Sequence, residues 1–226
     1  MRIKAWSYSR LNVYSKCPKM FKFKFIDKLP EPPSPAMERG NQIHKKAEAY
    51  AKGELSRVPT ELKLFAPQFR ELKKKKQAFA VEENWAFTKD FKQVTQWDNW
   101  NGAWCRVKID LVLHDKKSDN YTVIDHKTGK VRHEEHAEQL ELSALATFLS
   151  VPTADKITVE NWYIDHGPGY TQPHDFERKQ AASLKKKWIA KVKPMMSDVK
   201  FNERPGSYCR WCAFSKSRGG QCKFGG

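Results

Sequence analysis

The chain has 226 residues and carries 42 Lys and Arg against 26 Asp and Glu, a formal net charge of +16. A surplus of this size favours a polyanionic partner. No run of 18 apolar residues is available to cross a membrane, so we expect a nucleic acid as partner and no membrane. The length suits a single domain over residues 1–226, and 13 Phe, 8 Trp and 7 Tyr argue against a disordered chain.

Helical and extended patterns follow one another in an order typical of α/β proteins. Helices are expected over residues 8–15, 37–51, 60–79 (with a break at Pro67), 133–149 and 176–192. Strands are expected over residues 80–88, 103–114, 120–127 and 156–165. A Pro-rich loop at residues 28–36 and an irregular tail at 202–226 complete the chain. This order predicts a mixed β-sheet flanked by helices.

Two acidic residues lie within apolar strand patterns on either side of a polar turn. If that turn is centred between Lys117 and Ser118, Asp110 lies opposite Asp125, and Lys127 shares a face with Asp125. Two carboxylates can hold Mg²⁺ or Mn²⁺, and a lysine beside them can position a water and stabilise developing negative charge. These groups together favour phosphodiester hydrolysis. On spacing alone, a structural Asp–Lys ion pair is the alternative.

Several motifs occur in one order along the chain. They are Ser7-Tyr8-Ser9-Arg10-Leu11 with Tyr14 and Cys17-Pro18, Gly40 with His44, Glu82 with Trp85, and residues 106–110, 124–129 and 139–142. In this order they resemble the PD-(D/E)XK nuclease superfamily, specifically its RecB-like exonuclease branch, which includes phage and CRISPR-associated exonucleases. The resemblance implies a restriction-endonuclease-like fold.

The resemblance also implies a role for individual residues. The metal ligands would be His44, Asp110, Asp125 and the main-chain carbonyl of His126, while Lys127 would be the catalytic lysine, Gln139 would approach the scissile phosphate and Glu82 would be an upstream acid. Ser143 stands where the family has a tyrosine. The implied activity is a metal-dependent DNA exonuclease, acting on linear or single-stranded DNA in recombination, repair or phage DNA metabolism.

The tail contains three cysteines, Cys209, Cys212 and Cys222. Three thiolates do not close a structural tetrahedral site, and Cys17 is the natural fourth ligand. Four thiolates suit a [4Fe–4S] cluster or a Zn²⁺ ion, and the resemblance favours the iron–sulfur cluster. Such a cluster would clip the N-terminal helix to the tail. Unliganded cysteines are the alternative.

Other functions remain open from the sequence. A catalytically silent or partner-dependent nucleic-acid-binding subunit, with a recombination or CRISPR-type protein as partner, would show the same charge, and RNA is an alternative to DNA. Phe21, Phe23, Trp211 and Phe214 are candidates for stacking on single-stranded bases, with core packing as the alternative for each. Five cysteines without a secretory signal predict a reducing compartment, and the resemblance predicts a bacterial or phage-infected cytoplasm. The oligomeric state does not follow from the sequence.

Overall fold

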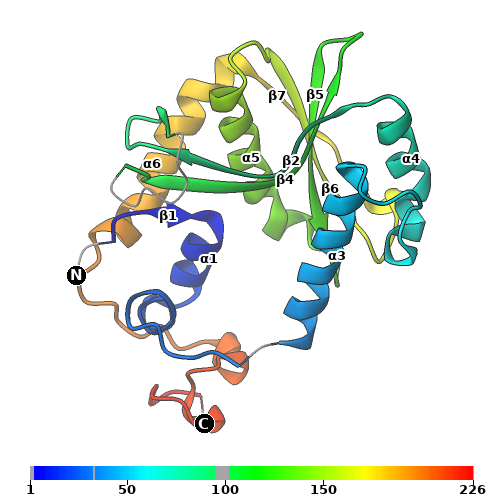
Figure 1. Cartoon of the computed structure of the whole chain (residues 1–226). Coiled ribbons are helices and arrows are strands. Elements are labelled where there is room, and N and C mark those ends of the chain that lie inside the picture. Colours follow the sequence, from blue (N-terminus) through cyan, green and yellow to red (C-terminus); the bar gives the residue numbers. More distant parts are fainter. Residues whose placement is uncertain (1–2, 33, 95–101, 226) are drawn as a thin grey trace.

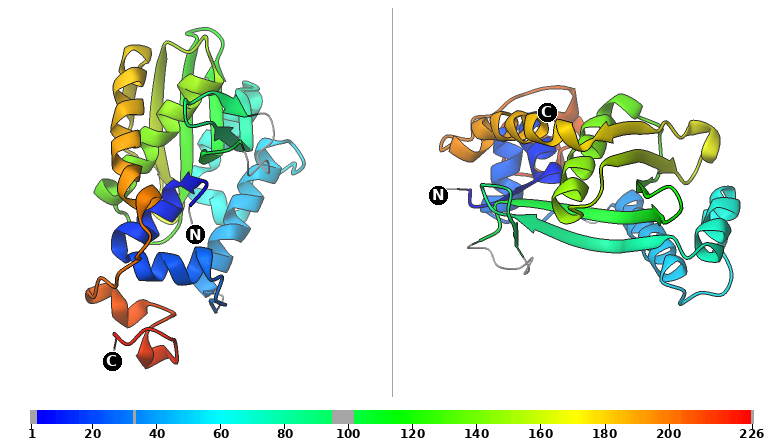
Figure 2. Two further views of the ribbon diagram at one scale, coloured as in Figure 1. Left: turned by 90° about the vertical axis from the view of Figure 1, so that its left-hand side faces the viewer. Right: turned by 90° about the horizontal axis from the view of Figure 1, so that it is seen from above.

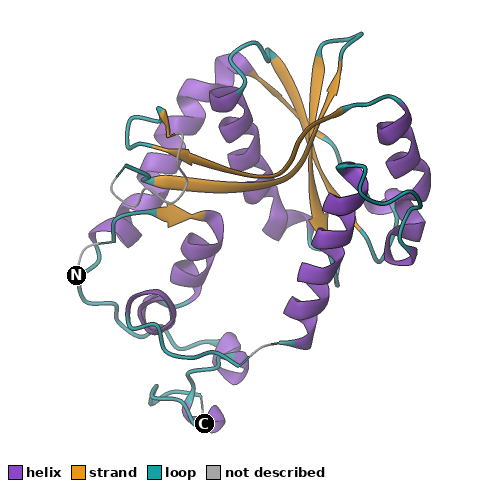
Figure 3. Ribbon diagram, viewed as in Figure 1, coloured by secondary structure: helices purple, strands orange, loops and turns teal. Residues whose placement is uncertain are grey.

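The computed structural model describes residues 3–32, 34–94 and 102–225. Its centre is a seven-stranded mixed sheet in the order β3-β2-β4-β5-β6-β7, with β1 pairing on β4 (Figure 1). Helices lie on both sides of the sheet (Figure 3). The predicted mixed sheet flanked by helices is therefore confirmed, and the arrangement is consistent with a restriction-endonuclease-like fold.

The longer strands lie where the apolar patterns predict them. The strands are β1 (Trp6–Ser7), β2 (Ala78–Phe87), β3 (Gln93–Val94), β4 (Cys105–Asp115), β5 (Asn120–Lys127), β6 (Lys156–Tyr163) and β7 (His174–Glu177). The β4–β5 hairpin has the predicted register, because Leu111 lies opposite Ile124 and Asp115 lies opposite Asn120. One further step along this ladder places Asp110 opposite Asp125. The short strands β1, β3 and β7 were not predicted.

The helices begin and end at recognisable sequence signals. They are α1 (Tyr8–Lys16), α2 (Pro18–Phe21), α3 (Pro35–Ala51), α4 (Ala66–Lys74), α5 (His133–Ser150) and α6 (Ala181–Ser197). Ser7 caps α1, and its side chain accepts a hydrogen bond from the main-chain N–H of Arg10 at 3.4 Å. Cys17 is extended between α1 and α2, as expected before a proline that begins a helix.

Two predicted helices are wrong in their bounds. The segment predicted as one helix over residues 60–79 is a 3₁₀-helix (Thr60–Phe65) followed by α4, and its last residue, Phe79, belongs to β2. Pro67 lies in the first turn of α4, where its missing N–H costs nothing, so it begins a helix instead of breaking one. The helix predicted from Phe176 starts at Ala181, because Phe176 pairs with Ile157 in the sheet.

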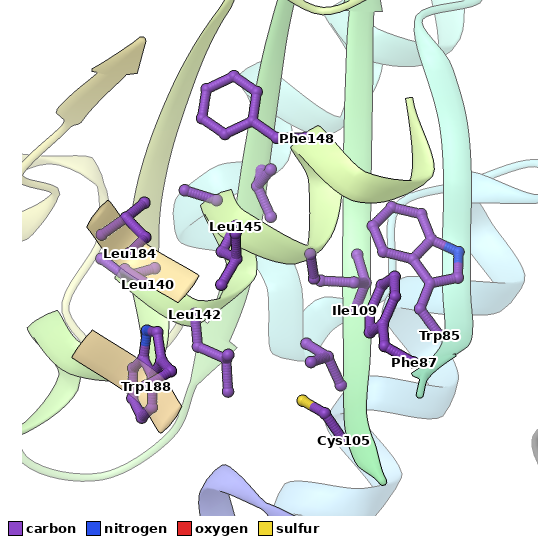
Figure 4. Packing of buried hydrophobic residues seen from close by; sticks show 14 of the residues in the cluster. Trp85, Phe87, Cys105, Ile109, Leu140, Leu142, Leu145, Phe148, Leu184 and Trp188 are labelled. Atoms are coloured by element: carbon purple, nitrogen blue, oxygen red, sulfur yellow. The ribbon is translucent and has the colours of Figure 1, made fainter. Parts of the chain in front are cut away.

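Helices cover both faces of the sheet, as the right view of Figure 2 shows from above, and a hydrophobic core lies on each face. On one face α5 packs against the sheet and α6 packs against α5, with Trp85, Ile109 and Trp188 among the buried side chains (Figure 4). On the other face α3 and α4 cover a smaller core that contains Phe69 and Trp162. The sheet is therefore buried on both sides, and buried carboxylates such as that of Asp110 lie where strands part.

Such a place exists along one edge of β4. This edge pairs with β5 from Leu111 to Asp115 and with β1 at Cys105 and Arg106, and the two pairings leave residues 107–110 between them. The side-chain alternation changes phase here: Ile109 lies in the core beneath α5, whereas Leu111 lies in the core beneath α3. The neighbouring strand β2 changes phase at Glu82, which has a φ of 53°. We call this opening between β1, β4 and β5 the fork.

The stack between α6 and β1 provides a test of the larger core. Trp188 is fully buried, and its ring stacks on Trp6 with centroids 5.7 Å apart. Trp188→Ala should lower the free energy of unfolding by about 3–5 kcal/mol, measured by denaturant titration, because it leaves a large cavity. Ile189→Ala, at an exposed position of the same helix, should change it by no more than about 0.5 kcal/mol. Equal losses in the two variants would contradict this packing.

Candidate active site

A cavity of about 380 Å³ opens at the fork, between the start of α1, α3, β4, β5 and α5. The predicted site residues that line it are His44, Asp110, Asp125, His126, Lys127 and Gln139. Ser7, Ser9 and Arg106 line it as well. Six of the seven residues predicted for the catalytic site therefore meet in one cavity, and the seventh, Glu82, contacts His44 beside it.

Asp110 is one of the two buried acids of the cavity. Its Oδ2 accepts a hydrogen bond from the main-chain N–H of His126 at 2.8 Å and lies 3.4 Å from Nδ1 of His44. The same nitrogen of His44 lies 3.3 Å from Oε1 of Glu82, and the other oxygen of Glu82, Oε2, pairs with Nζ of Lys108 at 2.5 Å. Of the two neighbouring acids on β2, Glu82 faces the site and Glu83 is exposed.

These contacts fix the charges of His44 and Asp110. Burial alone would lower the pKa of His44, but hydrogen bonds to Asp110 and Glu82 outweigh burial and raise that pKa to about 10. Burial would raise the pKa of Asp110, but the hydrogen bond and charge of His44 overcome it and lower that pKa to about 2. In the metal-free protein, an imidazolium therefore stands between two carboxylates, where a cation is needed.

A closed triangle of side chains lies on the other side of the cavity. Lys127 pairs through Nζ with Oδ2 of Asp125 and donates to Oε1 of Gln139 at 2.8 Å. Gln139 in turn donates through Nε2 to Oδ1 of Asp125 at 2.8 Å. Burial raises the pKa of Asp125, the nearby charge of Lys127 opposes this, and the charge of Asp110 adds to it. Ser143, in place of the expected tyrosine, bonds to the main chain of Gln139.

The loop after Lys127 is held against α3 by contacts that the sequence did not predict. Asp165 accepts hydrogen bonds from the main-chain N–H of Gly129 at 2.7 Å and from Arg39 at 3.0 Å. Gly129 has a φ of 80°, a conformation that favours glycine. A Cβ on Gly40 would lie 3.4 Å from Oγ1 of Thr128, an ordinary van der Waals contact, so α3 lies directly beside this loop. No local motif marks Arg39 or Asp165, because the two residues meet only in the fold.

The residues present fit a divalent cation. Within the described parts of the chain, one group of His, Cys, Asp or Glu side chains has its donor atoms all within 4.8 Å of one another, namely His44, Asp110 and His126. Both ring nitrogens of His126 are buried and lack a hydrogen-bond partner. The main-chain carbonyl of His126 was the predicted ligand; that its ring also joins the donor group was not foreseen from the sequence.

The four predicted cluster cysteines also come together. Cys17, at the start of α2, lines one small cavity with Cys209, Cys212 and Cys222 of the tail. Main-chain N–H groups point at two of the sulfurs, with Arg204 3.5 Å from Sγ of Cys17 and Gly206 3.4 Å from Sγ of Cys209. The tail thus lies against the N-terminal helices, as the left view of Figure 2 shows.

Most of the aromatic residues near this cavity form core. Phe23 and Phe214 are buried and pack on each other with ring centroids 5.6 Å apart, and Phe21 is also buried. Stacking on nucleic-acid bases is therefore wrong for these three residues. Trp211 differs, because 71% of its surface is exposed.

Comparison with known proteins places this site in a family. A sequence model described as the PD-(D/E)XK nuclease superfamily matches residues 5–217. The chain belongs to the PD-(D/E)XK nuclease superfamily. No curated protein matches the chain.

Two solved structures show limited similarity to this PD-(D/E)XK protein. The protein SSO0001 has 13% sequence identity and a TM-score of 0.40, and the match covers 99% of this chain and 88% of the SSO0001 chain. A protein from Eubacterium rectale, provisionally named an exonuclease, has 9% identity and a TM-score of 0.44, covering 93% of each chain. Likeness at this level carries no argument about activity.

Membership of the PD-(D/E)XK superfamily makes this chain a nuclease-family protein with a nucleic acid as its class of substrate and a divalent metal as its cofactor. The His–Asp–His group at the fork provides donors for such a metal. No helix in the described residues is long and apolar enough to span a membrane.

The charge of His44 predicts a pH dependence of the metal-free PD-(D/E)XK protein. The pKa of His44 rises from 6.5 to about 10 on folding, so its stabilising contribution is complete below pH 6.5 and is lost as the pH rises through about 10. In EDTA, the excess unfolding free energy of wild type over His44→Gln should therefore shrink between these pH values, as measured by denaturant titration. An excess that stays constant over this interval would contradict the assigned ion pairs.

Proposed function

We propose that this protein is a metal-dependent DNA exonuclease that acts on linear DNA with single-stranded or frayed ends. The observation that carries the proposal is the convergence, in one cavity, of a closed Asp125–Lys127–Gln139 triangle and the Asp110–His44 pair. A binding-only protein has no need to bury two carboxylates and a lysine so close together, because burying them is costly. The exonuclease assignment rests on the RecB-like order of the motifs.

Each residue would have a separate task in hydrolysis. His44, Asp110, Asp125 and His126 would hold the divalent metal, which when bound lowers the pKa of a water and neutralises charge on the phosphate. Lys127 would hold the attacking water through its ammonium group and stabilise the negative charge that develops. Gln139 would orient Lys127, since it bonds to both Lys127 and Asp125.

A second cavity supports the single-stranded part of the proposal. It measures about 760 Å³, shares Tyr8, Ser9, Lys127 and Gln139 with the first cavity, and extends to Arg210 and Trp211 in the tail. Because Trp211 is exposed, its ring is accessible to an unpaired base, and base stacking on an aromatic ring contributes about 1–3 kcal/mol.

The charges of this second cavity are compatible with a phosphate backbone. Its acids Glu135 and Glu138 pair with Arg132 and Lys191. Glu134 also lines the cavity, whereas Lys16 and Arg210 add positive charge on the side of α1 and the tail. We therefore expect the strand to run along the α1 and tail side.

Digestion of end-labelled linear DNA and closed circular DNA, each with Mn²⁺ or Mg²⁺, tests the activity. Wild type should degrade the linear substrate only, and Lys127→Ala and Asp125→Asn should each lose at least about 10²-fold in rate while still binding DNA. Lys117→Ala, in the turn between β4 and β5, serves as a matched control and should cleave normally. Cleavage of circles would identify an endonuclease instead. Binding without cleavage by wild type would favour a silent or partner-dependent subunit.

We further propose that the four cysteines bind a [4Fe–4S] cluster. The four cysteines line one small cavity, and Cys17-Pro18 resembles the first cluster cysteine of the RecB-like iron–sulfur nucleases. Four thiolates also suit a Zn²⁺ ion, which is the alternative. The cluster would join α2 to the tail and so hold the wall that carries Trp211.

Removal of one ligand tests this proposal. Cys17→Ser should lose most of the bound iron and melt at a lower temperature, because metal binding is coupled to folding. Cys105→Ala, at a buried cysteine outside the cysteine cavity, should keep its iron. Iron content and visible absorption give the readout. Stoichiometric zinc in wild type would support the zinc alternative, and a Cys17→Ser protein with full iron content would exclude Cys17 as a ligand.

A further inference from the structure

The ring of His126 is the most unusual polar group of the fork. It follows Asp125 on β5 and therefore points to the opposite face of the strand, toward α3 and α4. Only 4% of the residue is exposed, and its ring lies 5.9 Å from the rings of both Phe69 and Trp162. Neither of its nitrogens has a hydrogen-bond partner. A buried imidazole without partners is costly, so an interaction with a ligand would explain its position.

The nearest polar groups show which ligand the ring is placed to bind. Nδ1 of His126 lies 3.9 Å from Oδ2 of Asp110, and the ring of His44 is 5.9 Å away, measured between centroids. The donor atoms of these three residues all lie within 4.8 Å of one another. Two imidazoles and a carboxylate thus surround one point.

We infer that the ring of His126 is a metal ligand in its own right, and that the resulting imidazole–carboxylate–imidazole set selects Mn²⁺ over Mg²⁺. This inference rests on the proposed metal-dependent nuclease, since it concerns the same ion. Mg²⁺ favours oxygen ligands and gives up its waters reluctantly, whereas first-row transition ions accept imidazole nitrogen readily. A site whose only contribution from His126 is the main-chain carbonyl has one nitrogen ligand instead of two. Such a site would discriminate less between the two ions.

The two versions of the site differ in a property that can be measured without activity. Pulsed electron paramagnetic resonance of Mn²⁺ bound to the full chain reports how many imidazole nitrogens are coordinated. Wild type should show two, and His126→Leu and His44→Leu should show one each. His126→Leu should also lower the preference for Mn²⁺ over Mg²⁺, measured by competition titration, by at least about 10-fold.

Two further variants make the outcome decisive. His126→Asn keeps a polar side chain and covers the case in which the leucine variant does not fold, which thermal melting will reveal. His114→Leu changes a histidine at the far end of β4, outside the cavity, and should keep two nitrogens and the wild-type preference.

The results separate this inference from the function on which it rests. One nitrogen in wild type, or an unchanged ion preference in folded His126→Leu and His126→Asn, would overturn the inference and leave the nuclease proposal standing. Failure of wild type to bind either ion would overturn both. Two nitrogens in wild type and one in the His126 variants would establish the ring as a ligand.

Discussion

Two buried carboxylates, Asp110 and Asp125, lie opposite each other where β4 and β5 part, and an ionised carboxylate is stable there only beside positive charge or hydrogen-bond donors. The surrounding elements provide both. From one face of the sheet, α3 brings His44 to Asp110, and from the other face α5 brings Gln139 to Asp125. Helices from both faces of the sheet thus contribute side chains to one site, although they pack into separate hydrophobic cores.

The sequence was sufficient for the parts of the site that depend on local geometry. The register of a hairpin follows from its turn, and residues two apart on a strand share a face, so the juxtaposition of Asp110, Asp125 and Lys127 was predictable. The fork itself was not predictable from the sequence. It depends on β1, a two-residue strand that pairs with a segment about a hundred positions later, and on Glu82 in a left-handed conformation that no local pattern signals.

The contrast between local geometry and long-range contacts also explains two further differences between the sequence predictions and the structure. Phe21, Phe23 and Phe214 resemble a basic, aromatic binding surface in the sequence. In the fold Phe21 packs on Phe201 and Phe23 packs on Phe214 of the tail, so all three are buried, whereas Trp211 stays exposed. The family resemblance assigns His126 a role through its main-chain carbonyl only. Spacing in the sequence does not reveal that α3 places His44 close to the ring of His126, with ring centroids 5.9 Å apart. Long-range contacts, which spacing does not encode, decide both cases.

The cysteine cavity has a consequence for how the protein is made. The main-chain N–H of Arg204 points at the sulfur of Cys17, and the two residues are 187 positions apart. This contact therefore joins the N-terminal part of the chain to its C-terminal tail. A chain emerging from the ribosome completes β4, β5 and α5, with the acids and the lysine, well before the tail cysteines exist. Translation therefore separates the two sites in time: the acid–lysine site can fold first, and the N-terminal helices receive their second attachment only when synthesis is almost complete.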